Sequence, residues 1–142
     1  MYYGMWVFNT FVANSSKLLT TNTVSTTNSY VKVWSAISAT GQRSVLVIHK
    51  DMNATSSATV TIQLPAGMVL RGTASLTRVT PGAEGVYSNT GISFGGLTFD
   101  GTSDGKPTGT RVTESVSASA DGTEFVFSVQ PVSMALLVLP NA

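Results

Sequence analysis

The chain has 142 residues, of which 11% are charged, and a formal net charge of +1. This length suits one domain with a sizeable core, and the eight Lys and Arg residues are too few and too scattered for a nucleic-acid footprint. No apolar run approaches the roughly 20 residues that a membrane-spanning helix needs, so neither a nucleic acid nor a membrane is an expected partner.

The chain opens on its one segment with helical spacing, residues 2–12. Apolar side chains cover most of its surface, and five residues share one face: Tyr2, Met5, Trp6, Asn9 and Val12. Because so apolar a segment must pack against something, we expect residues 1–13 to cap the domain as a helix or to form an edge strand. No secretory leader precedes this segment, which suggests a fragment of a longer protein.

The pattern then becomes that of β-strands. Short runs rich in Val, Thr and aromatic residues alternate with turn signals built from Gly, Pro, Asn and Asp. The predicted strands are Lys17–Thr23, Tyr30–Ser38, Ser44–Lys50, Ala58–Leu64, Gly72–Thr80, Gly91–Phe99, Thr123–Val129 and Met134–Leu139, with a short one at Thr110–Val116. The run at 134–139 is apolar throughout, which predicts a strand covered on both faces. Together with the run at 45–48 it is expected to lie at the centre of a sheet.

This arrangement predicts an all-β fold. Many short strands with regular turns favour an antiparallel β-sandwich of about eight strands with a short N-terminal helical segment. No internal repeat or long linker divides the chain, so residues 1–142 are expected to form a single domain.

The sequence offers no catalytic set. The one histidine, His49, ends an apolar strand, and no G-x-S-x-G motif accompanies it. The seven acidic residues lie mostly in turns or at strand ends, where carboxylates are commonly solvated rather than paired for glycoside hydrolysis. We therefore expect no catalytic residue here, and we interpret His49 as a structural residue bonded to a backbone carbonyl.

One loop resembles the start of a calcium-binding loop. Asp100, Thr102 and Asp104 occupy its first, third and fifth positions, and Gly105 the sixth. The closing glutamate is missing, because the twelfth position is Arg111. Asp and Gly are equally what a hairpin loop requires. We therefore expect no cofactor, with a calcium ion at Asp100 and Asp104 as the alternative.

Exposed aromatic side chains are the candidates for carbohydrate binding, because a sugar ring stacks its apolar face on Trp or Tyr. Trp34, Tyr30 and Tyr87 are such candidates. Trp34 shares a strand face with Lys32, opposite a face of valines, so a core on the valine face would turn Trp34 outward. Trp34 is then a sugar platform, a contact with a neighbouring domain, or an ordinary core residue.

Two features bear on the cellular location. Abundant Ser and Thr with little charge is typical of extracellular β-domains, so we expect a secreted protein. Two N-x-[S/T] sequons, at Asn14 and Asn53, are compatible with glycosylation.

Five stretches stand in a recognisable order: Tyr2–Asn9, Val45–Asp51, Ala58–Leu64, Gly91–Gly101 and Val129–Leu139. Together they resemble the C-terminal β-sandwich domain of glycoside hydrolase family 79, the β-glucuronidase and heparanase-like enzymes. Similar domains follow the barrels of families 30, 39 and 51. The resemblance covers nearly the whole chain.

The resemblance implies a role for the opening segment. Residues 1–13 would be the remnant of the last helix of a catalytic (β/α)8 barrel, with Tyr2, Trp6 and Phe8 at the domain interface. The acid and nucleophile of such enzymes lie on barrel strands. The implied function is that of a non-catalytic accessory domain of a polysaccharide-degrading glycoside hydrolase, with the barrel as its partner. The alternative is a carbohydrate-binding module that binds a polysaccharide through exposed aromatics.

Overall fold

The computed structural model describes residues 2–13, 15–20 and 30–141. It contains one helix in these residues, α1 (Tyr2–Val12), so the opening segment is a helix and the edge-strand alternative is wrong. The strands, in chain order, are β1 (Ser15–Leu19), β2 (Val31–Ser38), β3 (Arg43–His49), β4 (Ala58–Gln63), β5 (Thr73–Thr80), β6 (Ser93–Phe94), β7 (Leu97–Thr98), β8 (Thr108–Gly109), β9 (Glu114–Ser117), β10 (Glu124–Val129) and β11 (Ser133–Val138).

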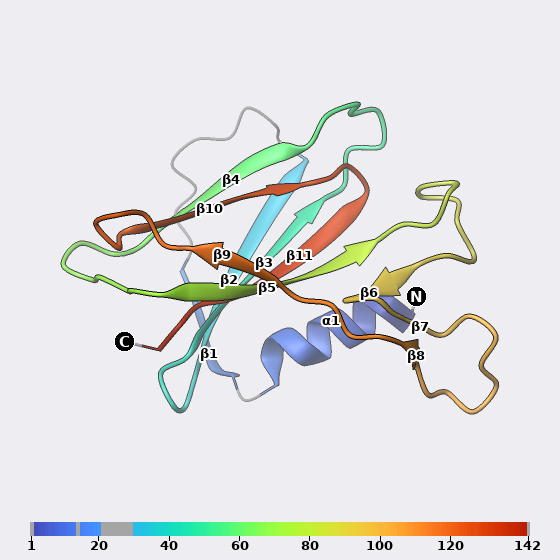
Figure 1. Cartoon of the computed structure of the whole chain (residues 1–142), viewed down its shortest axis with the longest axis horizontal. Helices are drawn as coiled ribbons and strands as arrows, with labels where there is room; N and C mark the ends of the chain where they lie inside the picture. Colours follow the sequence, from blue (N-terminus) through green and yellow to red (C-terminus); the bar gives the residue numbers. More distant parts are fainter. Residues whose placement is uncertain (1, 14, 21–29, 142) are drawn as a thin grey trace.

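The strands form two antiparallel sheets. The larger sheet has the order β1-β2-β3-β11-β5-β6-β7-β8, with β9 also paired to β5, and the smaller sheet consists of β10 and β4. Figure 1 shows the smaller sheet on one side of the larger one and α1 on the other. The predicted antiparallel sandwich with a short N-terminal helix is therefore confirmed, and β3 and β11 lie side by side at its centre.

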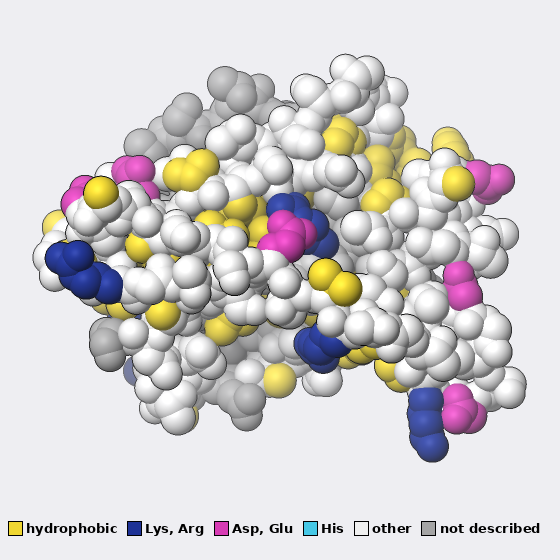
Figure 2. Space-filling view, viewed as in Figure 1, with side chains coloured by type: hydrophobic (Ala, Val, Ile, Leu, Met, Phe, Trp, Pro, Cys, Tyr) yellow, Lys and Arg dark blue, Asp and Glu magenta, His cyan; other side chains and the backbone are white. Residues whose placement is uncertain are grey.

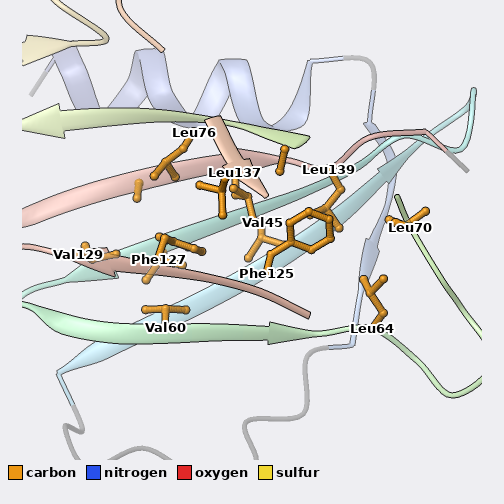
Figure 3. Packing of buried hydrophobic residues seen from close by; sticks show 14 residues of the cluster. Val45, Val60, Leu64, Leu70, Leu76, Phe125, Phe127, Val129, Leu137 and Leu139 are labelled. Atoms are coloured by element: carbon orange, nitrogen blue, oxygen red, sulfur yellow. The ribbon is translucent and has the colours of Figure 1, made fainter. Parts of the chain in front are cut away.

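The main core fills the space between the two sheets. Val45 and Leu137 of the larger sheet pack in one cluster with Val60, Phe125 and Phe127 of the smaller sheet, and Figure 3 shows their side chains pointing toward one another. The smaller sheet alternates, with apolar residues inward and, apart from Val126, polar residues outward.

A second core lies between α1 and the opposite face of the larger sheet. Val7 and Phe11 of α1 are buried there against Leu46, Leu136 and Phe94. The strands β3 and β11 are thus covered on both faces, which explains why their sequences do not alternate. The predictions that both strands are central and that Met134–Leu139 is covered on both faces are confirmed.

The predicted strand Gly91–Phe99 is wrong. It is a tight hairpin in which β6 and β7 pair through Phe94 and Leu97. Gly95 and Gly96 form its two-residue turn with φ values of 55° and 75°, and a turn with positive φ at both central residues strongly favours glycine. The strand predicted at Lys17–Thr23 is β1, whose bounds are Ser15–Leu19, and residues 21–23 lie outside the described residues. The short strand predicted at Thr110–Val116 is β9 and begins only at Glu114.

Candidate functional site

The outer side of α1 carries an uncharged, apolar surface. The helix has no charged residue, and Tyr2, Met5 and Phe8 are 72%, 55% and 59% exposed, respectively. We call these three residues the outer stripe. A helix that faces only water commonly carries polar side chains on this side, whereas the outer stripe is apolar and exposed.

Trp6, which the family resemblance places with Tyr2 and Phe8 at a domain interface, lies differently. Its ring makes an edge contact with Phe94 at 5.1 Å between centroids and a tilted contact with Phe99 at 5.2 Å. The hydroxyl of Tyr3 accepts a hydrogen bond from the backbone N–H of Phe99 at 2.8 Å. Trp6 is therefore half-buried and attaches the N-terminal half of α1 to its own domain, while Tyr2 and Phe8 stay exposed.

Trp34 lies on the face of the larger sheet that also carries α1. It pairs in register with Leu46, a residue of the core under α1, whereas Val31 and Val33 pack against the core between the sheets. Trp34 is 42% exposed. The valine face is thus core, and Trp34 is turned outward beside the helix.

Two lysines and a tyrosine share this part of the sheet. Lys32 is exposed on the same face of β2 as Trp34. The backbone N–H of Lys50 donates to the carbonyl oxygen of Tyr30 at 3.2 Å, which extends the pairing of β2 and β3 by one step. Strand alternation puts Tyr30 and Lys50 on the face of Lys32 and Trp34. We call these four residues the β2 row; sequence reasoning missed Lys50, because only the register brings it beside Tyr30.

Tyr87 lies in the loop between β5 and β6 and is 79% exposed. The loop is held by hydrogen bonds from Gly85 N–H to the Gly82 carbonyl and from Ser88 N–H to the Gly85 carbonyl. The Ser88 hydroxyl also accepts the N–H of Glu84 at 3.0 Å. The loop presents Tyr87 apart from the β2 row, so the structure brings Tyr30 and Trp34 together and leaves Tyr87 alone.

The loop proposed for calcium is held by its own turn contacts. Asp100 accepts the N–H of Gly91 at 2.6 Å, and Asp104 accepts the N–H of Lys106 at 3.0 Å. Within the described residues, no three His, Cys, Asp or Glu side chains gather where they could hold a metal ion. These contacts fit the hairpin-loop role that the Asp and Gly residues of the loop also predict. The calcium alternative stays a prediction.

His49 is almost fully buried at the end of β3. Its Nδ1 accepts the backbone N–H of Asp51 at 3.4 Å, and its Nε2 has no hydrogen-bond partner among the described residues. The expected bond to a backbone carbonyl is therefore wrong, because the ring accepts a hydrogen bond from an N–H.

The described carboxylates have contacts in loops and in two ion pairs. Glu114 pairs with Arg78, and Asp121 accepts the Ser119 hydroxyl at 2.6 Å. This bond, followed by those from Thr123, lowers the pKa of Asp121 below its ordinary value. In Figure 2 the charged side chains on the visible face are few and scattered. Among the described residues, none of these contacts brings together two carboxylates of the kind that glycoside hydrolysis uses.

Asn53, one of the two sequon residues, is exposed, and Asn14 lies outside the described residues. The described part of the chain holds no helix with the length and apolarity of a membrane span.

The chain is similar to known proteins in sequence pattern and in structure. A model of the family described as glycosyl hydrolase family 79 C-terminal beta domain matches residues 7–136. A comparison with curated protein sequences finds no match.

Solved structures include several with a similar domain. One is a 4-O-α-L-rhamnosyl-β-D-glucuronidase from Fusarium oxysporum 12S in complex with Rha-GlcA, 20% identical, with a TM-score of 0.69 over 97% of this chain and 29% of that chain. Another is CelM2, a bifunctional glucanase-xylanase from a metagenome library, 18% identical, with a TM-score of 0.48 over 80% of this chain and 16% of that chain. A third is the catalytic domain of GH30 xylanase C from Talaromyces cellulolyticus, 16% identical, with a TM-score of 0.43 over 82% of this chain and 19% of that chain.

The similarity to the Fusarium oxysporum glucuronidase shows the fold, and the chain spans less than a third of the length of that enzyme. The family match begins inside α1 and ends within β11, so it includes both sheets. It confirms the resemblance drawn from the sequence. The chain therefore belongs to the glycosyl hydrolase family 79 C-terminal beta domain family.

Proposed function

We propose that the chain is the non-catalytic accessory domain of a polysaccharide-degrading glycoside hydrolase, and that it supports the catalytic barrel by docking through the outer stripe of α1. The observation that carries the proposal is the exposure of Tyr2, Met5 and Phe8 on a helix without any charge. Family membership supports a parent enzyme with a catalytic domain.

The physical reason is that a helix between two domains can bury apolar side chains on both of its sides. The inner side of α1 is already buried by Val7 and Phe11 against the larger sheet. Burying a large apolar side chain stabilises by about 1.5–3 kcal/mol, so covering the outer stripe as well would hold two domains together. Trp6 then serves the docking indirectly, because it fixes the helix on its own sheet through Phe94 and Phe99.

The non-catalytic part of the proposal is supported by the placement of the polar groups. His49 is buried, and Asp100, Asp104 and Glu114 are engaged in loops or in ion pairs. Acid–base catalysis needs a titrating group within hydrogen-bond reach of a substrate. The chemistry of the parent enzyme would then belong to its catalytic domain.

The experiment compares variants in the parent enzyme. Met5→Glu and Phe8→Glu place a charge in the proposed interface, and Val126→Glu places the same charge at an exposed apolar position of β10, away from α1. We expect the two α1 variants to shorten the half-life of activity at elevated temperature, and Val126→Glu to leave it unchanged. In the 142-residue chain alone, Phe8→Glu should change the free energy of unfolding by no more than about 0.5 kcal/mol. Equal half-lives for all three variants would overturn the docking proposal.

A second function, polysaccharide binding, has one observation in its favour, which is the exposure of Trp34 on β2 and of Tyr30 directly before it. Aromatic rings on one face of a strand provide the apolar platform on which a sugar ring stacks. Both functions suit a secreted protein. The exposed Asn53 sequon and the low charge support that location.

A further inference from the structure

The β2 row combines two aromatic rings with two cations on one face of adjacent strands. Tyr30 and Trp34 are 53% and 42% exposed, and both lysines are exposed. At about 3.4 Å per residue, Tyr30 and Trp34 lie roughly 14 Å apart along β2, with Lys32 midway between them. This spacing fits a short run of sugar rings along the strand.

The two lysines lie close together. Lys32 pairs with Ile48, so Lys50 is its diagonal neighbour across β2 and β3, a spacing of roughly 7–8 Å in an antiparallel pair. The ion pairs among the described residues are Arg78–Glu114 and Lys106–Asp104, and neither Lys32 nor Lys50 takes part in them. Asp51 follows Lys50, but its Oδ1 accepts the backbone N–H of Asn53 at 3.0 Å. The β2 row therefore presents two positive charges that the described carboxylates do not neutralise by an ion pair.

The two lysines indicate whether the β2 row suits a protein partner or an anionic ligand. Lysine is depleted at the centre of protein interfaces, and burying an ammonium without a partner is costly. The outer stripe of α1 has no such charge, so it suits a protein partner better than the β2 row does. A ligand that stacks on aromatic rings and brings its own anionic groups suits the β2 row.

We infer that the β2 row, formed by Tyr30, Lys32, Trp34 and Lys50, binds an acidic saccharide such as a polymer of uronic acids. The sugar rings stack on Tyr30 and Trp34, and the carboxylates pair with Lys32 and Lys50. The inference rests on the second proposed function, saccharide binding, and is independent of docking through α1.

The test uses affinity electrophoresis of the 142-residue chain in gels that contain polygalacturonate or highly methyl-esterified pectin. The two polymers share a backbone, but the ester blocks the carboxylates. We expect polygalacturonate to retard the chain and the ester to have little effect. Lys32→Met and Lys50→Met should each weaken retardation by about fivefold, as expected for one charge-assisted contact, and Trp34→Ala by about tenfold.

Lys106→Met is the matched control, because it removes the same charge from a highly exposed lysine in a distant loop. It should leave retardation unchanged. Equal losses in Lys106→Met and Lys32→Met would mean unspecific charge attraction and would overturn the inference. Equal retardation by both polymers would keep saccharide binding and overturn the acidic specificity. No retardation by either polymer would overturn both, and none of these outcomes bears on the α1 interface.

Discussion

Arg78 and Glu114 form a two-point ion pair, with Nε to Oε1 at 2.6 Å and Nη2 to Oε2 at 3.1 Å. The remaining guanidinium nitrogen, Nη1, donates to the carbonyl oxygen of Ser128 at 2.6 Å. Arg78 lies on β5 of the larger sheet and Ser128 on β10 of the smaller one. One side chain thus joins the two sheets where the sandwich opens to solvent.

Replacing Arg78 should therefore weaken the sandwich. We expect Arg78→Ala to lower the free energy of unfolding by about 1–2 kcal/mol, because a hydrogen bond to a charged group contributes more than an exposed ion pair. Arg78→Lys should recover only part of the loss, because an ammonium cannot make the forked contact. Urea unfolding measures both changes.

The control is Lys106→Ala, which removes an exposed ion pair at 3.9 Å. Such a pair contributes about 0–1 kcal/mol, so this variant should unfold nearly as the unmodified chain does. If Arg78→Ala were no more destabilised than Lys106→Ala, the bridge between the sheets would not contribute to stability.

Adjacent residues of β10 provide a test of the main core. Phe125 is fully buried between the sheets, whereas Val126 points outward and is half-exposed. Phe125→Ala should cost about 3–5 kcal/mol, and Val126→Ala should cost well under 1 kcal/mol. Similar unfolding midpoints for the two variants would contradict the inward and outward alternation of β10.

Gly82 is required by close packing in the Tyr87 loop. A Cβ atom at this position would lie 2.0 Å from the carbonyl oxygen of Thr90. Gly82→Ala should therefore cost about 1–3 kcal/mol, the usual range for overpacking. Gly4→Ala is the control, because its Cβ would meet open space on α1, and it should stabilise by up to about 1 kcal/mol. Thermal unfolding that ranked the two variants in the opposite order would show that the loop is built differently.

Asp121 should titrate below 3.8, because the Ser119 hydroxyl, followed by the bonds from Thr123, stabilises its charged form. Because the pKa of Asp121 is lower in the folded than in the unfolded chain, its charged form stabilises the fold at pH values above the unfolded pKa, near 3.8. That stability is lost as the pH falls through the folded pKa. Ser119→Ala should move the carboxyl titration, followed by carbon NMR, back toward 3.8. Ser88→Ala, which removes a hydroxyl from another turn, should leave it in place, and an identical Asp121 midpoint in both variants would refute the assignment.

The alternation of the strands could be predicted from the sequence because one face of each strand meets the core. The outward position of Trp34 follows from the valines opposite it, and the doubly covered β3 and β11 follow from their uninterrupted apolar runs. The sequence also indicates the two-residue turn at Gly95 and Gly96, because paired glycines between apolar runs favour a hairpin. The interpretation as one long strand overlooked it.

Other features depend on contacts between distant segments. The Arg78–Glu114 pair joins residues 36 positions apart, and the placement of Lys50 beside Tyr30 depends on the register of β2 and β3. The sequence indicates that α1 must pack against something, but not that its inner side meets the larger sheet. Such contacts follow from the pairing of whole elements rather than from any local pattern.

The most direct test of the central claim is the solvent accessibility of the outer stripe. Hydroxyl-radical footprinting would compare Tyr2, Met5 and Phe8 in the parent enzyme with the same residues in the 142-residue chain. If α1 docks through the outer stripe, all three residues react freely in the chain alone and become as protected as the buried Phe125 in the parent enzyme. Reactivity in the parent enzyme that stayed as high as that of the exposed Val126 would contradict it.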